Sequence, residues 1–575
     1  MYYESRILPY KIKTTLWIVS LILLIIVGRL IHLQIILQHN FYHRSQKNFL
    51  RMETITPLRG NILDRNGNLI ATNRPTTNLY WHGTGSSKLT VNQYTLLQVL
   101  ETIVKKPLIE NDVIMQNIKH AERRYQKLLI AADISFEQLS QIAEQLPEEK
   151  NILITTHFKR FYPYKTFASH ILGYLSRVDL NSYGKMGLEK LCEDALKGES
   201  GSKVKTINSV GRNLSEVETK KACPGQNLIT TLNMDLQNIV EKVFPEDFSG
   251  TFLIMDPQQG DILALLSRPN FDPTLFLEPL GQEDWQQLQD RQPFLNRAFN
   301  ACYPPGSIFK LVSISALLEH NFITQDTCWN CRGYTEFAGR QYWCSNKTGH
   351  GLLNAEQSLI HSCNILFFEM AKKISVDLLA EYAYRFGLGK KADFMFAQKE
   401  GLIPTTQWKR KVKKEKWWPG ETLSVAIGQT YLLVTPIQVA CMIASIFTGY
   451  LVTPRVLLEE EVKKNPLAIS LDTRKFLQQS MQKVVKQGTG QRVKQITTDF
   501  KIFAKTSTAQ TSGMDKHDLG TQYWEHGWFV CYFYYKDEPP LVLVVLVEHA
   551  GTSRVSSEIA KNFFREYKKM VDSAS

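Results

Sequence analysis

An uncharged apolar run near the N-terminus constrains this chain more than any other feature of its sequence. Residues 14–28 carry no charged side chain, and apolar residues continue beyond Arg29 to Leu37. At ~1.5 Å per residue, a helix of about 24 residues crosses the ~30 Å hydrocarbon layer of a membrane. The sequence therefore predicts one transmembrane anchor at residues 14–37, preceded by a cytoplasmic tail at residues 1–13.

A cleaved secretory signal is the alternative interpretation of this run. No small-x-small cleavage pattern follows it, so we expect the anchor to stay on the chain. Basic residues flank the run on both sides, so the positive-inside rule does not decide which side of the membrane carries the rest of the chain. The chemistry of the motifs described below places that part outside the cytoplasm, where disulfides are also permitted.

Composition excludes several broad classes of protein. With 575 residues, 43% hydrophobic and 21% charged, the chain is globular and several domains long, which excludes wholesale disorder, collagen and a disulfide miniprotein. The net charge of +13 suits an anionic membrane surface, but over this length it does not indicate nucleic acid. The nine cysteines are an odd number, so at least one stays free, binds metal or pairs between chains.

The region from residue 38 to 246 consists of short strand-like runs separated by turn signals. Asn66-Gly67 between alternating residues favours a two-residue hairpin, and the stretches near 91–106 and 135–150 are typical of amphipathic helices. This texture predicts a first, mostly β domain.

A second domain begins at Thr251, where two buried strands flank a turn. It ends near residue 570 with apolar strands at 528–535 and 541–548 and a helix at 557–570. Together the two regions predict an α+β chain with domains at residues 38–246 and 251–570.

Ser307 and Lys310 place a hydroxyl and an amine three residues apart. On a helix both project from one face, so a neutral amine can take the hydroxyl proton. The same spacing occurs elsewhere in the chain, but only Ser307 follows a Tyr-Pro-Pro-Gly loop and precedes an apolar helical run. We therefore predict that this serine lies at a helix N-terminus, where developing negative charge is favoured.

Two later triplets supply further polar groups. Ser362-Cys363-Asn364 precedes an apolar run, and Lys505-Thr506-Ser507-Thr508 follows a strand-like one. A second hydroxyl can relay a proton, an amide can hold a lysine or a carbonyl, and a strand-borne lysine with hydroxyls can bind a carboxylate. Each triplet alone is weak evidence, but their order after Ser307 is informative.

The ordered set Ser-x-x-Lys, Ser-x-Asn and Lys-Thr-small resembles that of the active-serine penicillin-recognising acyltransferases. The whole chain looks like a class B penicillin-binding protein, a monofunctional peptidoglycan transpeptidase, and is most similar to elongation-type penicillin-binding protein 2. The supporting runs are 59–68, 171–174, 187–189, 255–257, 417–421, 424–429, 435–436 and 526–529.

The resemblance implies a fold and a set of partners. The fold is a single transmembrane helix, an elongated mostly-β pedestal of the dimerisation type at 38–246, and a transpeptidase domain at 251–570 whose central antiparallel sheet is flanked by helices. The implied partners are a D-Ala-D-Ala stem peptide of peptidoglycan, β-lactams and a membrane glycan polymerase of the rod-shape or SEDS type, with no nucleic acid. The implied location is the inner membrane, with the catalytic domain in the periplasm and no cofactor needed for catalysis.

Carried over to this chain, the resemblance also implies residue roles. Ser307 is the nucleophile and Lys310 its base, Ser362 relays the proton to the leaving D-alanine, and Asn364 holds Lys310 and the substrate amide. Lys505, Thr506, Ser507 and Thr508 form the strand that grips the terminal carboxylate. The oxyanion hole maps to the backbone N–H groups of Ser307 and Thr508. Each such donor typically lowers the activation barrier by ~3 kcal/mol.

One position departs from the family pattern. The family usually has Lys-Thr-Gly, often after a small residue such as glycine, whereas Ala504 and Ser507 flank the Lys-Thr pair here. Glycine allows close approach of a backbone to its ligand, so a side chain at 507 is expected to alter substrate geometry or β-lactam affinity. We still expect an active enzyme, because the lysine and both threonines remain.

Four further residues have a spacing close to that of structural zinc sites. Cys328, Cys331, Cys344 and His350 form Cys-x2-Cys-x12-Cys-x5-His. Zinc and disulfides both fit this pattern, with free thiols as a third alternative. Cys363 is interpreted as a small buried residue, with a fourth thiolate ligand as the alternative.

Other functions remain open from the sequence. A basic stretch at residues 409–416 beside tryptophans is interpreted as a solvated loop, with an anionic headgroup or polymer as its alternative ligand. A division-type transpeptidase, a water-using β-lactamase or carboxypeptidase, and a non-catalytic penicillin-binding scaffold are the alternative functions. The acceptor amine, the glycan and the oligomeric state do not follow from the sequence.

Overall fold

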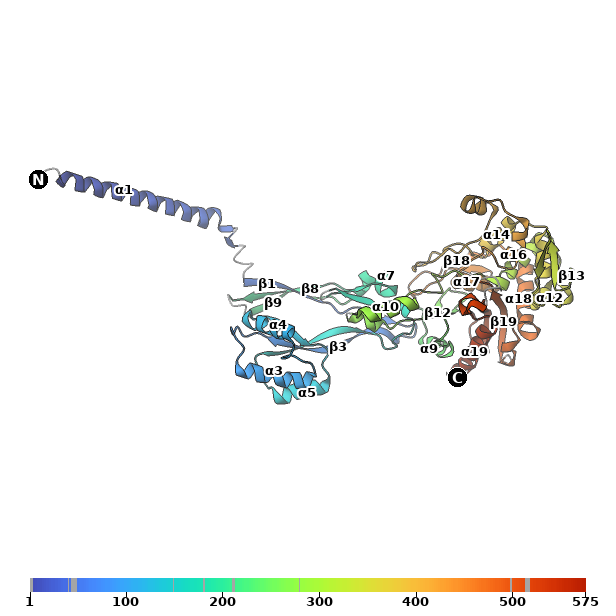
Figure 1. The fold of residues 1–575 in the computed structure, drawn as a ribbon, viewed down its shortest axis with the longest axis horizontal. Coiled ribbons are helices and arrows are strands. Elements are labelled where there is room, and N and C mark those ends of the chain that lie inside the picture. Colours follow the sequence, from blue (N-terminus) through green and yellow to red (C-terminus); the bar gives the residue numbers. More distant parts are fainter. Residues whose placement is uncertain are drawn as a thin grey trace. The chain divides into compact units, whose positions relative to one another are not determined.

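A computed structural model describes residues 4–39, 41–42, 49–147, 149–178, 181–208, 213–278, 280–496, 499–511 and 518–574 (Figure 1). The chain divides into two compact units, neither of which is contiguous. The first comprises 1–59, 73–159 and 197–225, and the second comprises 60–72, 160–196 and 226–575. Short segments of the predicted pedestal thus belong to the C-terminal unit, and the linear boundaries at 38–246 and 251–570 stay a prediction.

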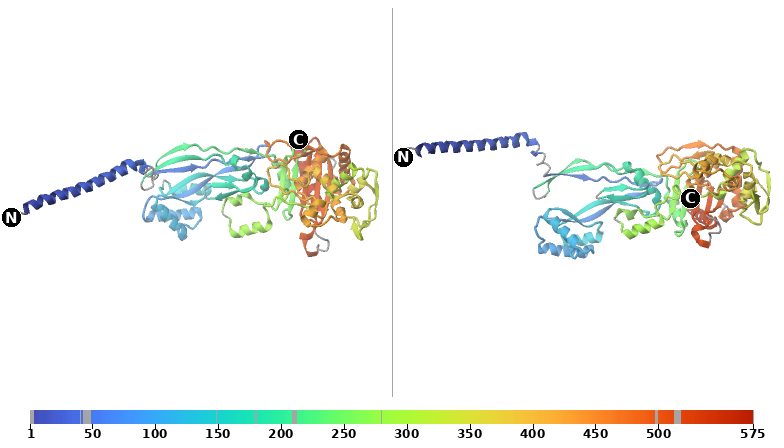
Figure 2. Two further views of the ribbon diagram at one scale, coloured as in Figure 1. Left: turned by 90° about the horizontal axis from the view of Figure 1, so that it is seen from above. Right: turned by 45° about the horizontal axis from the view of Figure 1, so that its top comes forward.

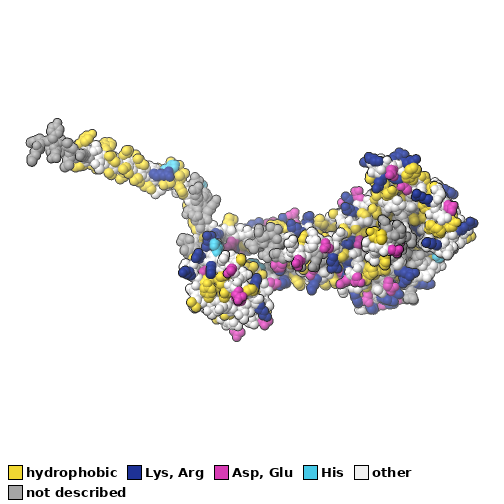
Figure 3. All heavy atoms as spheres, viewed as in Figure 1, with side chains coloured by type: hydrophobic (Ala, Val, Ile, Leu, Met, Phe, Trp, Pro, Cys, Tyr) yellow, Lys and Arg dark blue, Asp and Glu magenta, His cyan; other side chains and the backbone are white. Residues whose placement is uncertain are grey.

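The N-terminal apolar run forms helix α1 (Glu4–Ile31), which continues as a π-helical segment at His32–Ile36. Among the described residues, this is the one helix long and apolar enough to cross a membrane, over Ile12–Ile36. Its side chains from Ile12 to Ile31 are exposed, with Trp17 at 78% and Leu24 at 71%, and Figure 3 shows hydrophobic atoms along this part. An apolar helix with no protein around it is suited to a lipid environment.

The first unit is rich in strands. One antiparallel sheet has the order β1 (Leu50–Ile55), β8 (Gly201–Ile207), β9 (Asn213–Lys220). In the other, β3 (Leu69–His82) pairs with β4 (Lys127–Ala131) and β5 (Ile152–Phe161).

Three helices accompany these strands: α3 (Val91–Val104), α4 (Asp112–Arg123) and α5 (Phe136–Gln145). They begin at the side-chain caps Thr90, Asn111 and Ser135, whose oxygens accept from otherwise unpaired helix N–H groups. The two amphipathic helices predicted for this region are confirmed, and α4 adds a third.

Asn66-Gly67 lies in the turn that joins β2 (Ile62–Leu63) to β3, but this connection spans residues 64–68 and is longer than the predicted two-residue hairpin. Asp64 Oδ1 accepts hydrogen bonds from the backbone N–H of Asn66 at 2.9 Å and of Asn68 at 2.8 Å. Gly67 has φ +87°, which a residue without Cβ adopts freely. The strand β10 (Leu228–Ile229) then pairs in parallel with β2.

A five-stranded antiparallel sheet is the centre of the second unit. Its order is β12 (Ile262–Arg268), β11 (Gly250–Met255), β21 (Leu541–Val547), β20 (His526–Tyr535), β19 (Phe500–Ala509). Because side chains alternate along a strand, Val542 and Val544 enter one core and Leu543 and Val545 the other.

Helices cover both faces of this sheet. The helices α9 (Met234–Val243) and α19 (Arg554–Ala574) pack on the second core, and α11 (Lys310–Glu319) and α17 (Pro436–Thr448) on the first. In Figure 2 the C-terminal part, coloured yellow to red, forms one body in both views. This confirms the predicted α+β class and the antiparallel sheet flanked by helices.

The remaining elements complete the second unit. They are α6 (Ser169–Leu172), β6 (Leu175–Val178), β7 (Asn181–Gly184), α7 (Gly187–Leu191), α8 (Glu193–Leu196), η2 (Pro273–Leu277), α10 (Gln282–Arg291), η3 (Gly306–Ile308), β13 (Cys328–Cys331), β14 (Tyr334–Phe337), β15 (Arg340–Trp343), β16 (Gly351–Asn354), α12 (Ala355–Ile360), α13 (Ile365–Ala371), α14 (Val376–Arg385), α15 (Thr406–Trp408), η4 (Lys409–Lys413), α16 (Pro419–Ala426), β17 (Tyr450–Val452), β18 (Lys464–Pro466), α18 (Leu471–Gln487), η5 (Gln491–Ile496) and η7 (Thr521–Tyr523).

Candidate active site

Ser307 lies in the tight turn η3, immediately before α11. The sequence predicted a helix N-terminus here, and the structure places the serine in a 3₁₀ turn that leads into the helix. Gly306 has φ +52°, and its N–H donates to the carbonyl of Gly428 at 2.9 Å. Trp528 Nε1 donates to the carbonyl of Pro304 at 3.1 Å, so the loop that carries Ser307 is held against β20.

Lys310 is the first residue of α11, and its side chain is fully buried. Its Nζ donates to the Ser362 carbonyl at 2.7 Å, to Ser362 Oγ at 3.3 Å and to Asn364 Oδ1 at 2.7 Å. The Phe367 ring centroid lies 5.5 Å from the same nitrogen. Lys310 therefore joins the first motif, Ser-x-x-Lys at residues 307–310, to the second motif, Ser-x-Asn at residues 362–364.

Ser362 and Asn364 lie between α12 and α13. Ser362 has φ +53°, an unusual conformation for a residue with a side chain. Its Oγ accepts from Lys505 Nζ at 3.2 Å as well as from Lys310. A single hydroxyl thus bridges the two buried lysines, and the structure brings together Lys310, Ser362, Asn364 and Lys505 from three distant segments.

Burial lowers the pKa of both lysines. The pKa of Lys310 falls to about 8 because of desolvation, which the nearby Cys363 and Cys344 thiolates partly oppose. The pKa of Lys505 falls well below its ordinary value, first through desolvation and then through the charge of Lys310. Two amines around one hydroxyl do not both stay charged at low cost, so a neutral lysine, able to accept a proton, is available near pH 8.

The hydroxyls of β19 have separate partners. Thr506 Oγ1 donates to Thr489 Oγ1 at 2.6 Å, and Thr508 Oγ1 accepts from the backbone N–H of Ser553 at 3.2 Å. Ser507 Oγ accepts from the backbone N–H of Ser307 at 2.8 Å. Thr506 and Ser507 are buried and Thr508 is exposed. These contacts are all within the protein, and the carboxylate-binding role predicted for the three residues stays a prediction.

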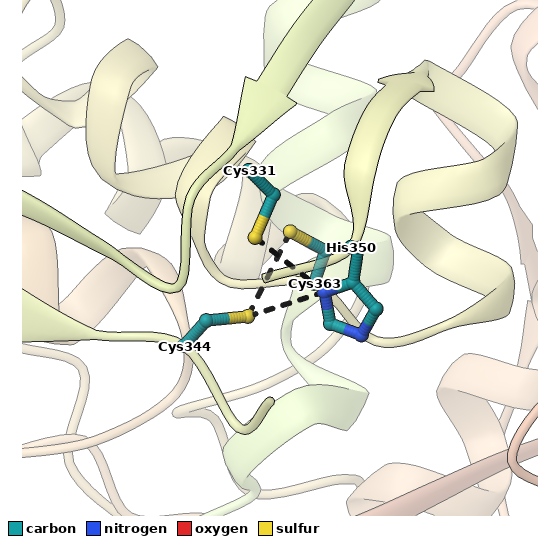
Figure 4. Close-up of side chains that lie close together, drawn as sticks. All are labelled: Cys331, Cys344, His350 and Cys363. Atoms are coloured by element: carbon teal, nitrogen blue, oxygen red, sulfur yellow. Dashed lines mark hydrogen bonds between the residues drawn. The ribbon is translucent and has the colours of Figure 1, made fainter. Parts of the chain in front are cut away.

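The structure corrects the membership of the cysteine and histidine cluster. Cys331, Cys344, His350 and Cys363 lie together, with all their ligand atoms within 4.8 Å of one another, and Figure 4 shows the four side chains pointing toward one another. Cys328 is exposed and bonds to the Asp326 carbonyl instead. Cys328 and Cys331 are three apart on strand β13, and this odd spacing directs their side chains to opposite faces.

The distances within this Cys331/Cys344/His350/Cys363 cluster fit tetrahedral zinc. Cys344 Sγ is 3.8 Å from Cys363 Sγ, and His350 Nδ1 is 3.5 Å from the Sγ atoms of Cys331 and Cys344. Zn–S bonds of ~2.3 Å and Zn–N bonds of ~2.0 Å at tetrahedral angles give edges of about 3.8 and 3.5 Å. All nine cysteines, each in the described part of the chain, are unpaired, which disfavours the disulfide interpretation.

The cluster is also attached to the second motif. Cys363 stands between Ser362 and Asn364, and the Asn364 N–H donates to Cys344 Sγ at 3.4 Å. Asn364 Nδ2 donates to the Trp343 carbonyl at 3.1 Å. Hydrogen bonding to Cys363 lowers the pKa of Cys344 to about 4, so Cys344 is readily a thiolate, the form that binds metal.

Sequence reasoning missed a buried ionic network behind the loop that carries Ser307. Tyr303 OH donates to Glu548 Oε1 at 2.6 Å, and Arg297 Nε lies 3.1 Å from Glu548 Oε2. His526 packs edge-on against Tyr303 with ring centroids 5.3 Å apart. The partners are 245 residues apart in sequence, and no local pattern signals their contact.

Comparison with known proteins identifies two family domains. Residues 250–567 match the penicillin binding protein transpeptidase domain, and residues 54–230 match the penicillin-binding protein dimerisation domain. The first match contains Ser307, Lys310, Ser362, Asn364 and Lys505.

Similar proteins extend over nearly the whole chain. Peptidoglycan D,D-transpeptidase MrdA of Acinetobacter baumannii is 29% identical over 98% of this chain and 88% of its own length. MrdA of Escherichia coli K12 is 27% identical over 92% of this chain and 89% of its own length.

Solved structures give the same result. The penicillin-binding protein PBP2 of Helicobacter pylori in complex with MreC has a TM-score of 0.75 at 26% identity, covering 91% of this chain and 99% of that chain. A chain of a peptidoglycan synthase complex, solved to describe the coordination of polymerization and crosslinking, has a TM-score of 0.74 at 28% identity, covering 97% and 98%.

Proposed function

Because the chain belongs to the penicillin-binding protein transpeptidase family, we propose that it is an elongation-type peptidoglycan D,D-transpeptidase that acts through an acyl-enzyme on Ser307. The observation that carries this proposal is the convergence of Lys310 and Lys505 on Ser362, with Asn364 Oδ1 accepting from Lys310, which follows the turn that holds Ser307. The MrdA relatives, which align over nearly the full length, support the elongation type over the division type.

Each residue has a defined part in the proposed reaction. Ser307 Oγ attacks the carbonyl of the penultimate D-alanine, forming a C–O bond, while neutral Lys310 takes its proton. The C–N bond to the terminal D-alanine then breaks, and Ser362 passes a proton to the departing amine. An amine of a second stem peptide attacks the ester, which forms the cross-link and returns the hydrogen to Ser307.

In the free protein Lys310 is engaged by Ser362 and Asn364, and among the hydrogen bonds of the described residues none joins it to Ser307 Oγ. Catalytic hydrogen bonds often tighten only once the substrate is bound. Asn364 is therefore assigned two tasks, holding Lys310 in place and accepting the substrate amide when it arrives.

Intact mass of the detergent-solubilised chain incubated with a penicillin tests this function. We expect one stable adduct on Ser307 that persists for hours, and none on a Ser307→Ala variant. Ser315→Ala is the matched control, because Ser315 is a buried serine of α11 whose hydroxyl bonds its own helix at the Leu311 carbonyl. Rapid loss of the adduct would instead favour a hydrolase, and the absence of any adduct a scaffold.

We also assign a structural zinc to the Cys331/Cys344/His350/Cys363 cluster. When bound, the metal supplies a cross-link between β13, the segment around Cys344 and the second motif, and it takes no part in the acyl transfer. The backbone N–H of Asn364 donates a hydrogen bond to Cys344 Sγ and so helps to hold this ligand atom in place. Through this bond and the position of Cys363, the cluster fixes the backbone immediately after Ser362.

The location and partners follow from the anchor and the relatives. We propose a single-pass inner-membrane protein whose chain after the anchor lies in the periplasm, where stem peptides are found. The H. pylori relative forms a complex with MreC, and another relative is part of a peptidoglycan synthase complex. We propose that this chain likewise works beside a membrane glycan polymerase of the SEDS type, which supplies uncross-linked strands.

A further inference from the structure

Ser507 lies on β19 at the position where the family usually has glycine. Its hydroxyl oxygen accepts a hydrogen bond from the backbone N–H of Ser307, the proposed nucleophile, at 2.8 Å. The family resemblance gives this N–H to the oxyanion hole, where it stabilises the carbonyl oxygen under attack. In the free protein, Ser507 Oγ accepts from this N–H in place of the substrate carbonyl oxygen.

The contact is built into the packing of the site. Ser507 is 3% exposed, and a Cβ on residue 306 would lie 2.3 Å from its Oγ, so the strand and the Gly306 turn touch at this point. Ser507 pairs with Trp528 across the sheet, and Trp528 Nε1 holds the Pro304 carbonyl. The turn and the strand are thus fixed to each other from behind, which keeps the hydroxyl within reach of the N–H.

An N–H group makes one strong hydrogen bond, so the Ser507 hydroxyl and an incoming carbonyl oxygen compete for it. We propose that Ser507 is a positioning residue that caps the Ser307 N–H in the free enzyme and must rotate away before acyl transfer begins. This rests on the proposed function, because it presumes that Ser307 is acylated. In this proposal, Ser507 lowers the rate of the acylation step.

Ser507 lowers the limiting rate of acylation and leaves the initial binding of the ligand nearly unchanged. The bond is exchanged only when the carbonyl oxygen enters the space beside Ser307, after the remote parts of the ligand have bound. Removing the hydroxyl is therefore expected to raise the limiting acylation rate about threefold to tenfold, which corresponds to one net hydrogen bond of ~0.7 to 1.4 kcal/mol. The concentration for half-maximal rate is expected to change less than twofold.

The experiment measures stopped-flow acylation of the full-length chain by a fluorescent penicillin over a range of concentrations. The variants are Ser507→Ala and Ser507→Gly, which remove the hydroxyl, and Ser507→Thr, which keeps one. Ser445→Ala is the matched control, since Ser445 is fully buried in α17 and its hydroxyl bonds the Met442 carbonyl. Thermal midpoints of all variants establish that each is folded before its rate is compared.

We expect the alanine and glycine variants to react faster than the parent, and the threonine and Ser445→Ala variants to react at or below the parent rate. Alanine and glycine variants that react at the parent rate or more slowly overturn the inference, because the hydroxyl is then neutral or itself a donor to the carbonyl. Failure of the parent and every variant to form an adduct overturns the proposed function instead.

Discussion

At the scale of single residues, the site depends on buried polar groups that bond to one another. The roles of Ser307, Lys310 and Asn364 rest on the family resemblance and stay predictions, but that Lys310 and Asn364 share one site was predictable from the order of the motifs. The convergence of Lys310 and Lys505 on Ser362 Oγ was not, since it depends on a positive φ at Ser362 and on packing between segments 143 residues apart. Cys363 was interpreted as a small buried residue with a fourth ligand as the alternative; it is buried, and it also lies in the Cys331/Cys344/His350/Cys363 cluster.

His526 gives a residue-scale prediction of pH dependence. Burial, followed by the charge of His549, lowers its pKa to about 4, and its Nδ1 accepts from the His549 N–H at 3.1 Å. Between about pH 6.5 and pH 4 the unfolded chain binds a proton here and the folded chain does not. The free energy of unfolding therefore falls as pH drops through this window, by up to about 3 kcal/mol from this group.

Thermal midpoints of the parent and a His526→Gln variant, measured from pH 7 to pH 4.5, check this expectation. The variant is expected to lose less stability on acidification, because glutamine does not titrate and its carbonyl oxygen can still accept from the His549 N–H. Other acid-sensitive groups act equally in both proteins and cancel in the comparison. Parallel pH curves for the two proteins would rule out this role.

At the scale of elements, the sequence predicted types well and pairings poorly. Apolar, β-branched runs indicated the strands at 528–535 and 541–548, and the structure has them as β20 and β21. The Cys-x2-Cys spacing was interpreted as part of a pattern close to that of zinc sites, whereas β13 is a strand whose alternation removes Cys328 from the cluster. Spacing predicts ligands only when the local backbone conformation is also known.

The cluster gives an element-scale prediction. Cys331→Ser and Cys363→Ser are each expected to reduce bound zinc from about one per chain to under ~0.2, because three ligands do not close a structural site. Both are also expected to lower the thermal midpoint, since metal binding stabilises only the folded state.

Cys328→Ser is the control for the metal cluster, because it lies on the same strand and faces the other way. Elemental analysis of the three purified variants decides the assignment. Zinc lost from Cys328→Ser, or retained by both cluster variants, would contradict it.

At the scale of the whole molecule, the order of regions along the chain was predictable and the composition of the compact units was not. The anchor, the mostly β region and the α+β region follow one another as expected. The segments 60–72 and 160–196 nevertheless belong to the second unit. Such long-range assignments depend on tertiary packing, which a pattern of hydrophobic residues along the chain does not record.

The anchor gives a prediction for the molecule as a whole. Cys223 and Cys328 are exposed, so a membrane-impermeant maleimide is expected to label both in intact spheroplasts. Lys13, on the other side of the apolar run, serves as the opposite reporter. A Lys13→Cys variant in a Cys223→Ser/Cys328→Ser background is expected to react only after permeabilisation, and labelling of that cysteine in intact spheroplasts would reverse the proposed orientation.

The interleaved segments of the second unit also determine the order in which the chain can fold during its synthesis. Strand β11, which lies between β12 and β21 in the sheet, pairs with β21, which leaves the ribosome almost 300 residues later. Until then the β11–β12 hairpin has an open hydrogen-bonding edge and uncovered apolar side chains, which invite aggregation. The central sheet of the catalytic half therefore cannot be completed until translation is nearly finished.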